Sequence, residues 1–157
     1  MNRPHSPFSL GSPGPVAYRQ EQPKYRSLPN LELIEVTYPE RILDIGKFRI
    51  EGWRNEKGVD PDFFAQKTWL DELDKKAKHW IVTDGEEIVA AARLSLHDSL
   101  DDVPYADMLT PEHQRHFESR KLASLNRLVV APEYRGHGLS GQLDAIRIES
   151  AKALGAE

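Results

Sequence analysis

An apolar segment, three glycines and an amphipathic segment follow one another near the end of the chain, and this order limits the fold more than any other feature. The segment SLNRLVV, residues 124–130, has the composition of a strand. The loop after it contains YRGHGLSG, residues 134–141, and apolar residues at helical spacing then predict a helix over about 138–154. The buried side of that helix is expected at Leu143, Ile146, Ala151 and Leu154. A strand joined to a helix by a glycine-rich loop is typical of a phosphate-binding turn in a chain that mixes strands and helices.

Two well-known phosphate loops fit these glycines poorly. A Walker loop needs Gly-Lys followed by Ser or Thr, which the sequence lacks. Gly136, Gly138 and Gly141 do spell the dinucleotide pattern G-x-G-x-x-G, but residues 131–135 separate the strand from the first glycine. The chain also ends 16 residues after Gly141, whereas the acidic residue of that fold stands about 20 residues on. A dinucleotide-binding domain is therefore the less favoured alternative, and a tight turn that binds nothing is another.

The N-terminal half predicts one strand and two helices. Alternating apolar residues in LELIEV indicate a strand over residues 31–36. Near-helical spacing of apolar residues then predicts a helix over about 40–54. Asp60 and Pro61 suit the start of a second helix, and the basic run that ends at Lys78 suits its C-terminus, so that helix is expected to run through the residues between them.

A β-hairpin is the clearest local signal in the middle of the chain. Apolar runs over residues 80–83 and 88–96 flank Asp84-Gly85, a dipeptide typical of two-residue hairpin turns. Residues 98–121 are polar and mixed, with a short helix expected after Thr110-Pro111. These elements predict an α/β (α+β) fold with a mixed, mainly antiparallel sheet flanked by helices.

Composition restricts the compartment and the partners. The chain of 157 residues is 39% hydrophobic and carries a formal net charge of -4, which fits one domain and argues against nucleic acid as a partner. It has no cysteine, so disulfides, thiol nucleophiles and thiolate metal sites are excluded, and a cytoplasmic location is expected. No apolar run reaches the ~18 residues of a membrane span, so no membrane partner is expected.

Residues 1–30 differ from the rest in composition. They hold six of the eleven prolines, several serines and glycines, and four basic groups against one acidic group. Few positions there could contribute to a core, so this segment is predicted to be a disordered leader, and residues 31–157 are predicted to form the domain.

The run LVVAPEYRGHGLSGQL resembles the acyl-coenzyme A loop of the GCN5-related N-acetyltransferase (GNAT) superfamily. The family pattern is Gln/Arg-x-x-Gly-x-Gly/Ala, and Arg135, Gly138 and Ser140 stand in its fixed places. Ser140 departs from the usual residue but is small. The order of the elements predicted over residues 31–157 agrees with the order in which that superfamily begins. The resemblance implies an N-acyltransferase that moves an acyl group from acetyl-CoA or another acyl-CoA to a small-molecule or other amine acceptor.

The resemblance also implies where the acyl-CoA binds. The backbone of the strand before the loop is expected to pair with the pantetheine arm, and the loop with the pyrophosphate. The implied residues are Leu128, Val129, Val130, Arg135, Gly136, His137, Gly138, Leu139, Ser140 and Gly141.

The catalytic groups are less clear from the sequence. Many members of the superfamily carry a glutamate base early in this strand, and the matching residue here is Ser124. The candidates are therefore His97, Asp98, Ser124 and Arg127, and Arg127 in an apolar strand must be exposed, paired or turned towards substrate. His113 and His116 have the spacing of a helical metal pair, but no third ligand stands nearby, so no metal is expected.

A weaker similarity, to the acyl-homoserine-lactone synthase-like branch, lies in Arg93-Leu94 and in residues 104–109. It implies an acyl group longer than acetyl. The superfamily fold is also expected to continue with further strands and a helix, which implies a chain truncated after the helix that follows the glycine loop. Residues 1–157 alone are then expected to be inactive, with a homo-oligomer or a completing chain at an open sheet edge. A non-catalytic GNAT-like domain that binds a ligand or protein is the alternative.

Overall fold

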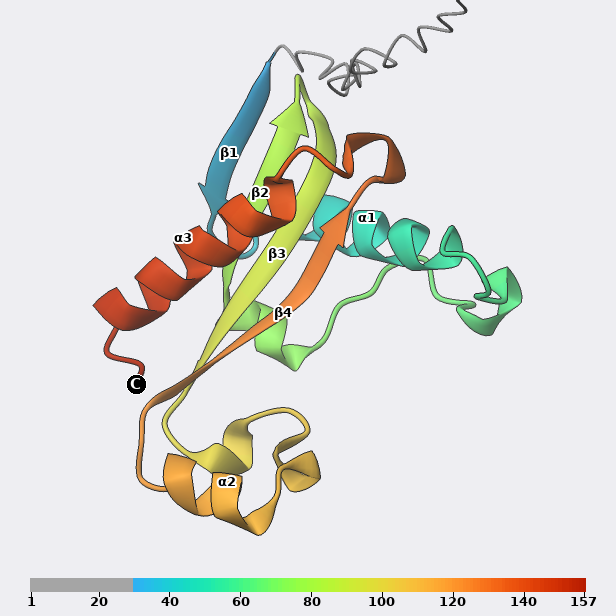
Figure 1. Cartoon of the computed structure of the whole chain (residues 1–157). Coiled ribbons are helices and arrows are strands. Elements are labelled where there is room, and N and C mark those ends of the chain that lie inside the picture. Colours follow the sequence, from blue (N-terminus) through green and yellow to red (C-terminus); the bar gives the residue numbers. More distant parts are fainter. Residues whose placement is uncertain (1–29) are drawn as a thin grey trace, which may run out of the picture.

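Four antiparallel strands form the centre of the protein. The computed structural model describes residues 30–157, so the predicted leader lies outside the described residues except for Asn30. The strands pair in the order β1-β2-β3-β4, which is also their order along the chain (Figure 1). They are β1 Leu31–Val36, β2 Lys78–Asp84, β3 Glu87–His97 and β4 Leu122–Val130. The predicted hairpin is confirmed, with Gly85 at a φ of +62° in its turn, and so is the mixed, mainly antiparallel fold class.

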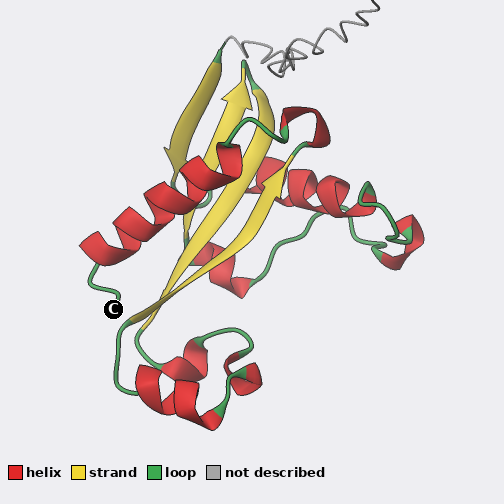
Figure 2. Ribbon diagram, in the orientation of Figure 1, coloured by secondary structure: helices red, strands yellow, loops and turns green. Residues whose placement is uncertain are grey.

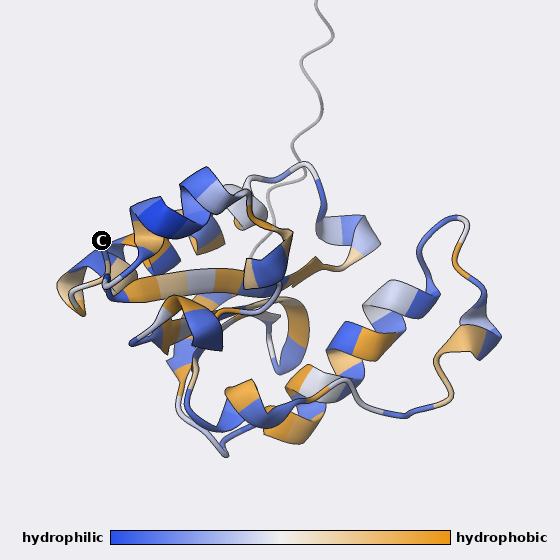
Figure 3. Cartoon of the chain, turned by 90° about the horizontal axis from the view of Figure 1, so that it is seen from below, coloured by the Kyte–Doolittle hydropathy of each residue, from blue (hydrophilic) through white to orange (hydrophobic). Residues whose placement is uncertain are grey.

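Two helices cover opposite faces of the sheet (Figures 1 and 2). On one face, α1 (Ile42–Arg54) buries Ile45 against Ile81 and Ala91. On the other face, α3 (Leu139–Ala153) packs against a larger cluster. That cluster holds Trp80, Val82, Val89, Ala90, Ala92, Leu94, Leu139, Leu143 and Ala151. In Figure 3 the apolar residues gather on the strands between the helices, while polar residues cover the outer side of α3. No helix within residues 30–157 is long and apolar enough to cross a bilayer.

A short helix, α2 (Pro111–Phe117), lies beyond the end of the sheet between β3 and β4 (Figure 1). Thr110 caps it through its hydroxyl, which accepts a hydrogen bond from the N–H of His113 at 3.3 Å. Pro111 stands at its first position, as the sequence predicts.

The second predicted helix, from Asp60 to Lys78, is wrong. The segment contains only two 3₁₀ turns, Pro61–Phe63 and Glu72–Lys75. Asp60 does cap the first turn, since its carboxylate accepts from the N–H of Asp62 at 3.0 Å. Between the turns the backbone forms hydrogen bonds with α1 instead of within the segment. The Trp69 N–H donates to the Gly46 carbonyl at 2.9 Å, and Arg54 donates to the Gln66 carbonyl at 2.7 Å. These tertiary hydrogen bonds outweigh the local helical pattern.

The buried face of α3 also differs in part from the prediction. Leu143 and Ala151 are buried as expected, but Leu154 is 38% exposed. Arg147 is buried instead, because its guanidinium reaches into the sheet.

Candidate active site

β4 carries a bulge at Arg127, where the candidate site begins. Ala91 pairs with Val129 and Arg93 with Asn126, so one residue of β3 stands opposite two of β4. Arg127 takes up the extra length with a φ of +55°. The bulge places the side chains of Asn126 and Val129 on the same face of the sheet, the one that α1 covers, because Asn126 contacts Arg93 and Val129 contacts α1.

Arg147 supports the bulge from the opposite face. Its Nη1 donates to the carbonyl of Arg93 at 3.1 Å and to the carbonyl of Asn126 at 3.3 Å. Its Nε donates to the Leu143 carbonyl at 3.1 Å, and its Nη2 pairs with Asp144. Burial lowers the pKa of the Arg147 guanidinium below its ordinary value. One side chain of α3 therefore joins both strands beside the bulge.

A cleft of about 700 Å³ follows the C-terminal half of β4. Its two walls come from β4 with the glycine loop and from α1 with the segment after it. The lining residues are Leu128, Val129, Val130, Arg135 and Ser140 on the first wall, and Gly52, Trp53, Glu56, Lys57 and Val59 on the second. The first wall consists entirely of residues that the sequence assigned to acyl-CoA.

The two walls of this cleft touch at its base. A Cβ atom added to Gly52 of α1 would lie 2.5 Å from Cγ1 of Val129 in β4. Any side chain at Gly52 would therefore require α1, β4 or the Val129 side chain to shift. The present spacing of helix and strand therefore requires a glycine at this position.

The other predicted cofactor residues lie in the loop and in the first turn of α3. Gly136 and Gly138 both have a φ of +79°, and no other atom lies within 4 Å of a Cβ placed on Gly136, Gly138 or Gly141. The first hydrogen bond of α3 runs from the Gln142 N–H to the Gly138 carbonyl at 3.1 Å. The preceding N–H groups have no partner inside the helix. Leu139 points its side chain into the core, so only its backbone faces the loop.

Arg135 stands at the mouth of this cleft. Its Nε donates to the Val130 carbonyl at 3.1 Å, and its Nη2 forms an ion pair with Glu56 from the opposite wall. The two side chains are 46% and 41% exposed. Arg135 therefore bridges the cleft in this structure.

A second cleft, of about 350 Å³, opens on the N-terminal side of the bulge. It is lined by Asp71, Glu72, Leu73, Arg93, Pro104, Tyr105, Asn126 and Arg127. Arg127 forms an ion pair with Asp71 at 2.8 Å and lies 3.9 Å from the ring centre of Trp69. Of the three fates that the sequence left open for Arg127, the structure shows pairing, at the edge of a cleft.

A buried ion cluster supports the second cleft. Arg49, Asp74 and Arg93 are each at most 1% exposed. Asp74 binds Arg49 at 2.9 Å and Arg93 at 3.0 Å, and Arg93 reaches Asp71 at 2.6 Å. Burial raises the pKa of Asp71, but hydrogen bonds from Arg93 and Arg127 outweigh it and bring this pKa to about 2. For Asp74, burial is likewise outweighed, chiefly by the charge of Arg49, and its pKa is lowered.

Arg49, Asp71 and Asp74 were not among the site residues predicted from the sequence. The two aspartates were assigned to the middle of a helix that does not form. An Asp-x-x-Asp spacing could have indicated them. Asp71 caps the second 3₁₀ turn, and the Asp74 carboxylate accepts a hydrogen bond from the Asp71 N–H at 2.8 Å.

The structure brings two of the candidate catalytic residues together. His97 Nε2 lies 2.7 Å from Ser124 Oγ, across the pair of strands β3 and β4. His97 is 3% exposed, and burial lowers its pKa below the ordinary value, with Arg93 acting in the same direction and Asp102 opposing. Asp98 is exposed and lines a hollow next to α2 instead.

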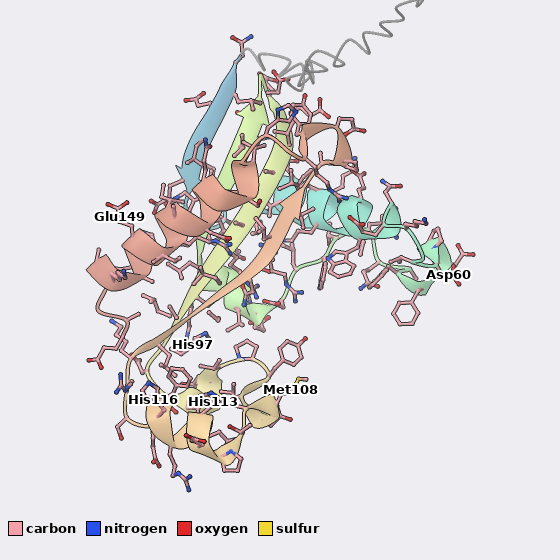
Figure 4. The ribbon with its side chains drawn as sticks, in the orientation of Figure 1. Asp60, His97, Met108, His113, His116 and Glu149 are labelled. Atoms are coloured by element: carbon pink, nitrogen blue, oxygen red, sulfur yellow. The ribbon has the colours of Figure 1, made fainter. Side chains whose placement is uncertain are left out.

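His113 and His116 lie on α2, past the sheet end where His97 sits (Figure 4). His113 Nδ1 is 2.7 Å from the Thr110 hydroxyl. Within residues 30–157, no group of three His, Cys, Asp or Glu side chains is placed to hold a metal ion.

Comparison with known proteins assigns the fold to a family. The sequence model of one protein family, the acetyltransferase (GNAT) domain, matches residues 47–143, which is more than half of the chain. A GCN5-related N-acetyltransferase from Ralstonia eutropha JMP134 has a similar structure, with a TM-score of 0.55 and 18% identity over 81% of this chain and 79% of that chain. A putative acetyltransferase from Pyrococcus horikoshii has a TM-score of 0.52 and 14% identity over 82% and 78%.

A predicted acetyltransferase from Clostridium acetobutylicum, solved with acetyl-CoA, has a TM-score of 0.51 and 15% identity over 82% of this chain and 77% of that chain. At such identities the structures share the fold alone. A search of curated protein sequences finds no match. The family match covers the greater part of α1, the sheet from β2 onwards and the glycine loop, and it includes every residue that lines the two clefts. The chain therefore belongs to the acetyltransferase (GNAT) domain family.

Proposed function

We propose that this protein transfers an acyl group from acetyl-CoA or another acyl-CoA to an amine. The observation that carries the proposal is the first cleft, which runs along β4 to Arg135 and the glycine loop. A nucleotide pyrophosphate suits the loop because unpaired N–H groups at a helix start attract anions. The open space around the three glycines leaves room for it.

The rest of an acyl-CoA fits the same cleft. β4 is the edge strand of the described sheet, so its outer backbone groups beside Leu128 and Val130 can pair with the amides of a pantetheine arm. Trp53, Val59 and Leu128 provide apolar surface for its methylene groups.

The second cleft supplies a place for the acceptor. The two clefts have neighbouring lining residues on β4, Leu128 in the first and Arg127 in the second. An amine in the second cleft can therefore attack the thioester carbonyl carbon of an acyl-CoA in the first, which forms the amide and releases the thiolate. Such an arrangement needs no acyl-enzyme intermediate, because it aligns both substrates at the bulge.

Binding of acetyl-CoA in preference to NAD tests the proposal. We expect calorimetric titration to show saturable binding of acetyl-CoA and none of NAD at the same concentrations. Arg135→Ala should weaken acetyl-CoA binding, while Arg41→Ala, which removes the arginine directly before α1, should leave it unchanged. Binding of NAD without binding of acetyl-CoA would overturn the proposal. Release of thiol in the presence of an amine panel separates an acyltransferase from a domain that only binds the ligand. Turnover by residues 1–157 would also overturn the expectation that this stretch alone is inactive.

The ion pair between Arg135 and Glu56 leads to a further prediction. A pyrophosphate at Arg135 must compete with the Glu56 carboxylate, which occupies the guanidinium and repels the ligand. Glu56→Gln is therefore expected to tighten acetyl-CoA binding about threefold to tenfold, a range that corresponds to roughly 1 kcal/mol for an exposed pair. Glu51→Gln on α1 is the control, since Glu51 pairs with Lys47 and not with Arg135. Weaker binding by Glu56→Gln would mean that Glu56 positions Arg135 for the ligand.

A further inference from the structure

The proposed transfer requires a group that accepts the proton of the amine, and the carboxylates beside the second cleft do not suit this task. A general base works best when its pKa is near the working pH. The pKa of Asp71 is about 2, and that of Asp74 is also lowered. Both carboxylates already accept hydrogen bonds from arginines. Their chemistry is that of fixed counter-ions.

A chain of hydrogen bonds leads from this cleft to His97. Arg93 Nε donates to Asn126 Oδ1 at 2.8 Å, which turns the amide of Asn126 so that its Nδ2 donates to Ser124 Oγ at 3.3 Å. Ser124 thus accepts from Asn126, and its own hydrogen is left to point at His97 Nε2, 2.7 Å away. The order of donors is fixed at its start, because a guanidinium can only donate.

The same chain fixes the tautomer of His97. If Ser124 donates to Nε2, the ring carries its hydrogen on Nδ1. A serine hydroxyl that donates to a neutral imidazole can receive another proton as it gives up its own. The arrangement is built from residues of β3 and β4.

We propose that Ser124 and His97 form a proton relay for the acyl transfer. This inference rests on the proposed function. As the amine nitrogen bonds to the carbonyl carbon and the C–S bond breaks, a proton leaves the nitrogen and reaches Ser124 Oγ through solvent, because Asn126 and not Ser124 lines the second cleft. The hydroxyl proton of Ser124 passes to His97 Nε2 in the same step. The resulting imidazolium returns its proton to solvent, and solvent protonates the departing thiolate.

The surroundings of His97 keep the imidazole neutral at neutral pH. Burial and the positive charge of Arg93 on its own strand lower its pKa, while Asp102, from the turn after β3, raises it less. Ser124, from β4, is uncharged. The relay needs neutral His97 to accept the proton. The rate of transfer is therefore retained above the pKa of His97 and falls as the pH drops through that pKa. The midpoint is expected below about 6.5, the ordinary value for histidine.

The test compares variants of the full chain by thiol release and by calorimetry with acetyl-CoA. With an amine that the wild type acylates, His97→Gln is expected to lower kcat/KM about a hundredfold and to remove the acidic limb of its pH profile, with acetyl-CoA affinity unchanged. Ser124→Ala removes only a hydroxyl group from the same relay. It should likewise lower kcat/KM about a hundredfold and leave acetyl-CoA affinity unchanged. His113→Gln on α2 is the matched control and should keep both rate and profile.

A rescue variant separates the relay from a structural role. In the double variant Ser124→Glu, His97→Gln, a carboxylate stands where the serine hydroxyl was. We expect it to restore at least tenfold in kcat/KM over His97→Gln, with an acidic limb moved towards about 4.3, the ordinary pKa of glutamate. If His97→Gln and Ser124→Ala keep the wild-type rate while acetyl-CoA still binds, the relay is wrong and the proposed function stands. If the wild type neither binds acetyl-CoA nor releases thiol, both are wrong.

Discussion

Asp74→Ala is expected to lower the free energy of unfolding by about 3–5 kcal/mol, the range seen when one partner of a buried ion pair is removed. Asp74 is 1% exposed and binds Arg49 at 2.9 Å and Arg93 at 3.0 Å. Arg93 keeps its contact with Asp71, but Arg49 keeps only a 3.3 Å hydrogen bond to the Trp69 carbonyl. The substitution therefore leaves a positive charge in the interior without a counter-ion. Chemical denaturation followed by tryptophan fluorescence measures the change.

Two further variants make this result specific. Glu72→Ala removes the exposed partner of Lys75 in the same 3₁₀ turn, and because that pair is solvated its loss should be barely measurable. Arg49→Met combined with Asp74→Ala should recover a large part of the loss, since no unpaired charge then remains at this position. An Asp74→Ala protein as stable as Glu72→Ala would show that Arg49 reaches water in solution.

Gly138→Val is expected to weaken acetyl-CoA binding by more than a hundredfold. Gly138 directly precedes the first turn of α3, and the space around it is open. A branched side chain there would stand between the ligand's pyrophosphate and the N–H groups of that turn. A valine at a φ of +79° also has a strained backbone, which should lower the free energy of unfolding by about 1–3 kcal/mol. Calorimetry with acetyl-CoA and thermal melting measure the two effects separately.

Gly85→Val is the matched control for backbone strain. Gly85 also has a positive φ, +62°, and open space around it, but it lies in the turn between β2 and β3. The two variants should lose comparable stability, and only Gly138→Val should lose the ligand. If Gly138→Val melts far below the control yet still binds acetyl-CoA, the glycine loop has a structural role alone.

The sequence predicted the parts of the fold that depend on neighbouring residues. Asp84-Gly85 specifies a turn, Thr110-Pro111 starts a short helix, and the run of residues 124–141 specifies strand, loop and helix start. The helix predicted after Asp60 does not form, and it shows what a local sequence pattern cannot predict. Its backbone polar groups are taken by Gly46 and Arg54 of α1, and such long-range hydrogen bonds leave no trace in a local pattern.

The candidate site likewise has one part that the sequence predicted and one part that it did not. Most residues of the proposed acyl-CoA loop are adjacent in sequence, so one motif contains them. The second cleft joins Asp71, Arg93 and Arg127, which come from three separate elements and meet only through the register of β3 and β4 and the 3₁₀ turn beside them. His97 and Ser124 were each recognisable as polar residues near strands, but their pairing depends on which residue of β4 faces His97.

The contact between Gly52 and Val129 has a consequence for how this enzyme family can diversify. The helix and the strand touch at a position where glycine has only a hydrogen atom as its side chain. The width of the cleft therefore depends on the size of the residue at position 52. A one-nucleotide change from glycine to alanine would insert a carbon atom 2.5 Å from Cγ1 of Val129, so that α1, β4 or the Val129 side chain must shift. Across related chains, the size of the residue at this place should therefore vary with the breadth of the ligand that lies beside β4, and libraries built to alter acyl selectivity would gain most from starting there.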